Sequence, residues 1–117
     1  MGFIGLKNGG IIEANGATFL TFSDYAKNAI RMSAMMDLPV TYLLTHDSIA
    51  VGEDGPTHQP IEQINNLRAI PRLKLWRPSS ALECAVAWHK CIDNKSGPNA
   101  IVLSRQKSNL FFKEAAT

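Results

Sequence analysis

The chain has 117 residues, enough for one domain and too few for two. It is 45% hydrophobic and 19% charged, as ordinary globular domains are, and a net charge of +2 with scattered Lys and Arg argues against a nucleic-acid partner. No apolar run approaches the roughly 20 residues of a membrane span, so no membrane partner is expected.

The first half of the chain shows two periodic segments. Residues 1–18 are rich in Gly, Asn and Ala without a clear period, so we expect an irregular N-terminal segment. Apolar side chains recur at helical spacing over 20–36, which predicts a helix that Pro39 ends. The continuous apolar run at 40–44, VTYLL, predicts a buried strand, and a polar, glycine-rich loop is expected over 46–59.

The second half alternates in the same way. A helix is predicted over 60–69, because a proline suits its first position and an acidic residue falls in its first turn. The short run LKLW at 73–76 predicts a strand, and a helix follows over 80–93. The run AIVLS at 100–104 predicts a last buried strand, and a mixed tail occupies 107–117.

The predicted helix over 80–93 carries both cysteines of the chain. Cys84 and Cys91 are too far apart on a helix for a disulfide, so we expect reduced cysteines and a cytoplasmic location. No CxxC or HxxxH spacing is present, so no metal site is predicted. Ser79 or Ser80 can cap this helix, with Glu83 three residues after Ser80. Its predicted apolar side consists of Leu82, Ala85, Val86 and Trp88.

The alternation of helices and strands predicts an α/β fold with a parallel sheet flanked by helices and right-handed crossovers. Ligands of such sheets bind beyond the carboxyl ends of the strands. His46 follows the first buried strand at one residue's distance, and Arg105 directly follows the last one. We therefore expect an imidazole and a guanidinium at the same edge of the sheet.

The polar candidates have plainer explanations as well. Asp54 and His58 could bind hydroxyl groups or move a proton, or they could be a turn cap and an exposed histidine. His46 could belong to an ordinary turn after a strand. Arg105 could bind a phosphate or a carboxylate, or it could be a solvated charge at the sheet edge.

Phe19, Phe22 and Tyr25 fall at three-residue steps. They could form an aromatic wall for a flat heterocycle. A stripe of aromatic residues at helical spacing is more often part of a hydrophobic core. Spacing alone leaves both explanations open.

Several segments resemble one enzyme family. The stretch GEDGPTHQPIEQ at 52–63 is similar to the signature loop of transketolases, and THDSI at 45–49 precedes it as in that family. The stretch TFLTFSDYAKNAIRMSAMM at 18–36 resembles the family's aromatic-rich helix. WRP at 76–78 and LSRQ at 103–106 fit as well, so the resemblance covers nearly the whole chain.

The resemblance implies the pyrimidine-binding, middle domain of a transketolase over residues 19–106, incomplete at its N-terminal side. Transketolases use thiamine diphosphate and a divalent metal, magnesium or calcium, to move a two-carbon ketol unit between sugar phosphates. In this domain Phe19, Phe22 and Tyr25 would wall the aminopyrimidine ring of the cofactor.

The resemblance also implies roles for the polar candidates. His58 would be the catalytic residue, contacting the cofactor-bound ketol and assisting proton transfers. Asp54 would bind a sugar hydroxyl, and His46 and Arg105 would hold a sugar hydroxyl and the phosphate end. The implied substrate-binding residues are therefore His46, Asp54, His58 and Arg105.

Two features of the family have no counterpart in the sequence. The catalytic glutamate lies in a GxxE segment well ahead of the aromatic residues, and Glu13 is too close to Phe19 to take its role. The motif of the diphosphate- and metal-binding domain, GDG…N, is also absent. We therefore expect a transketolase-type fragment that is inactive alone and binds no cofactor tightly by itself.

Such a fragment needs a partner. We expect a second chain that carries the diphosphate-binding domain, or self-association, because lost elements would leave apolar surface open. The alternative is a non-catalytic interaction domain that pairs with a full-length transketolase or another partner.

Overall fold

The structure is a computed structural model that describes residues 14–107. Helices and strands alternate along these residues. The strands are β1 (Asn15–Phe19), β2 (Thr41–Thr45), β3 (Lys74–Trp76) and β4 (Asn99–Val102). The α-helices are α1 (Ser23–Met35), α2 (Gln63–Arg68) and α3 (Ala81–Asp93), and 3-10 turns occupy Leu20–Phe22, Ile49–Val51 and Pro56–His58.

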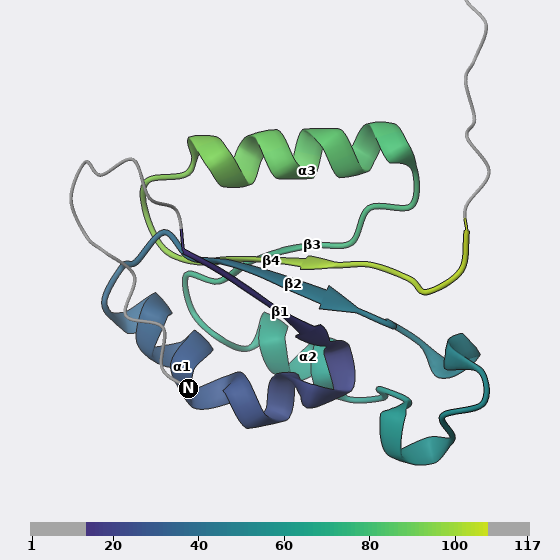
Figure 1. Cartoon of the computed structure of the whole chain (residues 1–117). Helices are drawn as coiled ribbons and strands as arrows, with labels where there is room; N and C mark the ends of the chain where they lie inside the picture. Colours follow the sequence, from purple (N-terminus) through teal and green to yellow (C-terminus); the bar gives the residue numbers. More distant parts are fainter. Residues whose placement is uncertain (1–13, 108–117) are drawn as a thin grey trace, which may run out of the picture.

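The four strands form one parallel sheet in the order β1-β2-β4-β3. Helices α1 and α2 lie on one side of this sheet and α3 lies on the other (Figure 1). The predicted class, a parallel α/β sheet flanked by helices, is confirmed.

The core has two parts, one on each side of the sheet. Tyr42, Leu44, Ala100 and Val102 pack with residues of α1 and α2, whereas Ile101 packs with Ala87 and Cys91 of α3. Successive residues of β4 therefore face opposite layers, and all four are buried. This explains why the two central strands read as continuous apolar runs instead of alternating ones.

The first strand begins inside the segment that the sequence predicts to be irregular. Residues 15–18 belong to β1, which pairs with β2 from Asn15 opposite Thr41 to Phe19 opposite Thr45. An Asn and a Gly weaken the strand signal of this short segment. Gly16 has a packing reason, because a Cβ there would lie 3.4 Å from the ring of Tyr42. Residues 1–13, with Glu13, and 108–117 lie outside the described residues.

Helix α2 starts later than the sequence predicts. Pro60 is buried and lies ahead of the helix, whose first residue is Gln63. The Gln63 side chain accepts a hydrogen bond from the backbone N–H of Ile61 and donates one to Asp24 of α1. These bonds bend the chain at 61–62 and fix the start of α2 against α1.

Helix α3 has the predicted cap and a different buried side. The Ser80 hydroxyl accepts a hydrogen bond from the Glu83 N–H, and the Glu83 carboxylate accepts one from the Ser79 N–H. The predicted apolar side is wrong for Leu82, Ala85 and Val86, which are exposed, and right for Trp88, which packs against the buried residues of this layer. Small side chains of α3 contact the sheet instead, which leaves room for the half-buried indoles in this layer, Trp76 and Trp88.

Among residues 14–107, none of the helices is both long enough and apolar enough to cross a membrane. Neither Cys84 nor Cys91 forms a disulfide.

Candidate functional site

The loop after β2 depends on residues with positive φ. His46, the first residue after the strand, has a φ of 59°, a left-handed conformation that few non-glycine residues adopt. Gly52 and Gly55 have φ values of 97° and 75°, so both turns of the loop require glycine. The loop thus turns sharply at the carboxyl end of β2 and folds back over that edge of the sheet.

Five of the seven predicted site residues meet at this edge. The His46 ring stacks on Phe19, with ring centroids 3.7 Å apart and planes inclined by 16°. The His58 ring meets Phe22 edge-on at 5.1 Å and Phe19 at 6.1 Å. Phe22 lies 5.8 Å from Phe19 and 6.0 Å from Tyr25. We call these residues the aromatic–imidazole cluster: Phe19, Phe22, Tyr25, His46 and His58.

Both histidines of the cluster use one ring nitrogen within the chain. His46 Nδ1 lies 2.9 Å from the Thr45 hydroxyl, and His58 Nδ1 lies 2.8 Å from the Thr57 hydroxyl. Neither Nε2 atom has a hydrogen-bond partner among the described residues. An imidazole held at Nδ1 with Nε2 open can bind a ligand hydroxyl or exchange a proton with it.

The aromatic residues do not belong to the hydrophobic core. Tyr25 is 88% exposed, and Phe19 and Phe22 are half-buried at the edge of the sheet. Phe22 and Tyr25 border a cavity of about 500 Å³, within the rough range of small-molecule sites. We call this cavity the aromatic hollow; its other lining residues are Gly16, Ala17, Thr18, Ala26, Ala29, Tyr42 and Leu44.

Tyr42 forms the floor of the aromatic hollow. Its hydroxyl lies 2.5 Å from the Ser33 hydroxyl, which itself donates to the Ala29 carbonyl. Burial raises the pKa of the Tyr42 phenol above its ordinary value, and the hydrogen bond with Ser33 acts in the opposite direction. The hollow therefore has a neutral wall at physiological pH.

The other two predicted residues stand apart from the cluster. Asp54 is exposed between Gly52 and Gly55 and makes no hydrogen bond or ion pair with the described residues. Arg105 is also exposed and makes no such bond, and β4 ends three residues before it, at Val102. The parallel pairing of β2 and β4 does bring their carboxyl ends to one edge, as predicted.

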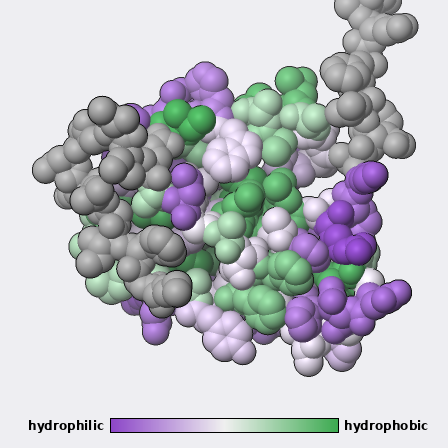
Figure 2. Space-filling view, viewed as in Figure 1, coloured by the Kyte–Doolittle hydropathy of each residue, from purple (hydrophilic) through white to green (hydrophobic). Residues whose placement is uncertain are grey.

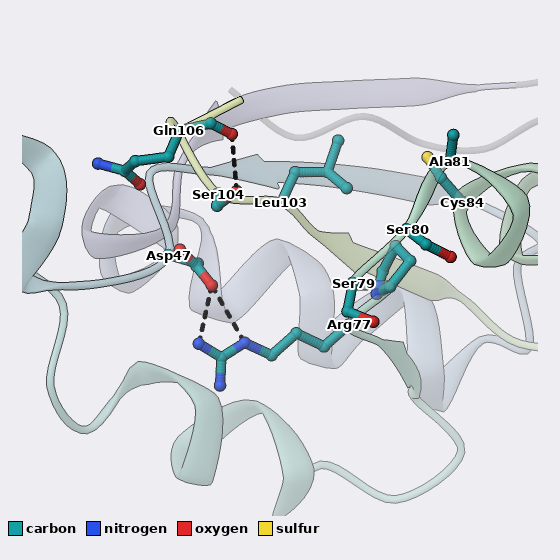
Figure 3. Close-up of a pocket in the computed structure, with 10 residues that line it drawn as sticks. Asp47, Arg77, Ser79, Ser80, Ala81, Cys84, Leu103, Ser104 and Gln106 are labelled. Carbon is teal, nitrogen blue, oxygen red and sulfur yellow. Dashed lines mark hydrogen bonds and ion pairs between the residues drawn. The ribbon is translucent and has the colours of Figure 1, made fainter. Parts of the chain in front are cut away.

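An ion pair at the same edge was not foreseen from the sequence. Asp47 follows β2 and Arg77 follows β3, and the Arg77 guanidinium donates two hydrogen bonds to Asp47 (Figure 3). The pair borders a cavity of about 660 Å³ between the start of α3 and the end of β4. Opposite charges within two residues of the ends of two parallel strands are the signal that could have revealed it.

The described residues include no group of three or more His, Cys, Asp or Glu side chains that could hold a metal ion. The aromatic hollow has no charged side chain in its lining. Its surface therefore suits a flat, uncharged ring better than a phosphate or a metal ion.

Comparison with known proteins gives a consistent result. Residues 3–109 match the family described as transketolase, pyrimidine binding domain. Transketolase 2 of Xanthobacter flavus is 55% identical over 100 residues, which cover 86% of this chain and 15% of that protein.

Solved structures similar to this chain are also transketolases. A crystal structure of transketolase from Campylobacter jejuni has a TM-score of 0.83 at 44% identity and covers 92% of this chain and 17% of its own. A split-gene transketolase, described as an inactive beta4 tetramer, has a TM-score of 0.70 at 26% identity, over 87% of this chain and 32% of its own. The chain thus spans 15% to 17% of the length of the two full relatives.

Proposed function

Because the chain belongs to the transketolase family, we propose that it supplies the aminopyrimidine and sugar-phosphate contacts for thiamine diphosphate-dependent transfer of two-carbon ketol units. The observation that carries this proposal is the aromatic–imidazole cluster at the carboxyl edge of the sheet. Aromatic faces for a ring and open imidazole nitrogens for hydroxyl groups stand side by side there, which is what the reaction requires.

Thiamine diphosphate with magnesium or calcium is the proposed cofactor of the complete assembly, where it supplies the nucleophilic carbon of ketol transfer. Phe22 and Tyr25 border an apolar hollow that fits a flat ring, and Phe19 extends the same wall. No charged side chain lines that hollow. The diphosphate and the metal would therefore be bound by another part of the assembly.

The histidines of the cluster would act on the sugar. We assign proton transfer to Nε2 of His58, because the Thr57 hydroxyl at 2.8 Å holds its other nitrogen. His46 would bind a sugar hydroxyl through its own Nε2. Asp54 would accept a hydrogen bond from a second hydroxyl, and Arg105 would pair with the phosphate. Both side chains are exposed and free of partners among the described residues, so a sugar phosphate could recruit them.

A chimera tests the proposal. Residues 14–107 replace the matching segment of the Xanthobacter flavus transketolase, and ketol transfer between sugar phosphates is measured. We expect a folded, active chimera whose activity falls when His58 is replaced by Ala. A folded chimera that binds thiamine diphosphate and has no activity would contradict the proposal, and would favour the non-catalytic interaction domain instead.

We further propose that the isolated chain is inactive and associates with a partner chain that carries the diphosphate-binding domain, or with itself. Leu82 and Val86 of α3 are 75% and 49% exposed. Figure 2 shows further apolar surface in the middle of the face that contains the β1 edge, with hydrophilic residues gathered near the carboxyl ends of the strands. The split-gene relative, an inactive tetramer, supports the same arrangement.

Sedimentation of the isolated chain tests the association. We expect a dimer or larger species at micromolar concentration, and Leu82→Glu should shift it toward the monomer if α3 takes part. A monomer at every accessible concentration would refute self-association. Cys84 and Cys91 are reduced thiols, which supports the proposal of a reducing, cytoplasmic location.

A further inference from the structure

His46 and Asp47 are adjacent in the chain, and their side chains make contacts toward opposite sides of the carboxyl edge of the sheet. The ring of His46 stacks on Phe19, at the end of β1 on one side of β2. The carboxylate of Asp47 reaches past the end of β4 to Arg77, which follows β3 at the other side of the sheet. The contacts of residues 46 and 47 thus join the ends of the two edge strands.

The Asp47–Arg77 pair is held more firmly than a surface ion pair. Arg77 Nε and Nη2 lie 3.1 and 2.8 Å from the same oxygen, Asp47 Oδ2. The Asp47 side chain is only 11% exposed, and that of Arg77 is 49% exposed. Figure 3 shows two nitrogens of the guanidinium converging on one oxygen of the carboxylate. Two charged donors on one oxygen of a mostly buried side chain restrict where Asp47 can lie.

The backbone between these contacts needs such a restraint. His46 has a φ of 59°, in the left-handed region that only about a few per cent of non-glycine residues occupy, although histidine is found there more often than most. Within residues 14–107, the ring of His46 makes one hydrogen bond, to Thr45, its own neighbour in the chain. The contact with Phe19 is a stack without a hydrogen bond. Relaxation of the turn at His46 would therefore carry the imidazole away from Phe19.

We propose that Asp47 and Arg77 are positioning residues that hold the left-handed turn at His46 and so keep its imidazole stacked on Phe19. Neither side chain needs to touch the sugar for this purpose. The inference rests on the proposed function only in that it gives His46 a reason to be held in place.

The opposite edge of the sheet offers a matched control. Asp37 also has a positive φ, 57°, and also pairs with an arginine, Arg72. That pair is longer and more exposed, with 3.8 Å between Arg72 Nη1 and Asp37 Oδ1 and side chains 65% and 39% exposed. Asp37 precedes β2 and Arg72 precedes β3, so both lie at the amino ends of the strands. Arg72→Gln therefore removes the same kind of charge without changing the carboxyl edge.

The test measures the His46 ring protons by NMR in the full 117-residue chain. Their resonances are assigned by their loss in His46→Gln, and the Phe19 stack should displace them upfield by its ring current. We expect Arg77→Gln and Asp47→Asn each to return these resonances most of the way to their positions in an unfolded peptide. The double variant should do no more than either single one. Arg72→Gln should leave them displaced.

The conservative variant separates positioning from general stability. Arg77→Lys keeps the charge without the two-nitrogen fork, so it should restore part of the displacement. Ring protons that stay upfield in folded Arg77→Gln and Asp47→Asn would overturn the proposal, as would an equal loss in Arg72→Gln. These signals do not depend on ketol transfer. An inactive chimera would therefore count against the proposed function and leave this inference to be decided by NMR.

Discussion

Replacement of Asp54 by Ala tests whether this side chain binds the substrate or stabilises the folded protein. The Asp54 side chain makes no hydrogen bond or ion pair with the described residues, and its φ is not in the positive range. Ala therefore fits the backbone and removes no contact within residues 14–107. We expect the free energy of unfolding to change by no more than about 0.5 kcal/mol, as at other exposed positions.

The cost should appear in catalysis instead. A charged acceptor matched to a sugar hydroxyl contributes about 1.5–3 kcal/mol. Its loss should lower kcat/KM of the chimera by roughly one to two orders of magnitude for sugars with the preferred hydroxyl configuration. Sugars with the other configuration never formed the bond and should lose little. Cofactor affinity should hold, because the wall of Phe19, Phe22 and Tyr25 is untouched.

Steady-state kinetics on two sugars that differ at this hydroxyl decide the matter. Glu53→Ala is the matched control, because Glu53 is the neighbouring acid and is likewise exposed without a partner among the described residues. It should affect both sugars by the same small factor. Equal losses for both sugars in Asp54→Ala, or a collapse of cofactor affinity, would show that Asp54 shapes the loop and does not read the substrate.

Four further outcomes are expected. Tyr42→Phe should lower the free energy of unfolding by about 0.5–1.5 kcal/mol near neutral pH. Because burial raises the Tyr42 pKa, urea unfolding should show that wild type loses stability as the pH rises through that raised value and that the variant does not. The hydrogen bonds from Ser79 lower the Glu83 pKa, so the stability that Glu83 adds is present above its ordinary pKa and lost as the pH falls through the lowered one; the melting curves of wild type and Glu83→Gln should converge in acid. Calorimetric titration of the isolated chain with thiamine diphosphate and magnesium should show only weak binding, with Kd above about 1 mM. The reason is that no positively charged side chain lines the aromatic hollow to bind the diphosphate. In the chimera, Arg77→Gln should lower kcat/KM and add nothing when His46 is already Ala.

The fold follows from the sequence wherever burial on both sides of an element leaves a simple pattern. Strands β2 and β4 lie between two helical layers, and their continuous apolar runs predict them within one or two residues. Strand β1 is different, because it lies at the edge of the sheet and its sequence, NGATF, carries little strand propensity. Pairing with β2 supplies what the local sequence does not.

Two kinds of sequence information located residues of the site: the ends of predicted strands and the resemblance to a known family. The resemblance pointed to Phe19, Phe22 and Tyr25, and the topology pointed to His46. Their close packing depends on the left-handed turn at His46, and a histidine adopts that conformation too rarely for the sequence alone to predict it. The sequence left open whether Arg105 is a solvated charge and whether Asp54 caps a turn, because loop geometry beyond a strand end is set by tertiary contacts.

Helix α3 shows why a hydrophobic face read from sequence can be assigned to the wrong layer. Apolar residues surround most of this helix, so periodicity alone cannot say which side meets the sheet. The two indoles on that side, Trp76 and Trp88, already fill much of the layer, and close approach then favours Ala87 and Cys91 at the contact. Leu82 and Val86 are left outward for the same reason. The packing that stabilises one side of the sheet thus creates the apolar surface by which the chain is expected to associate.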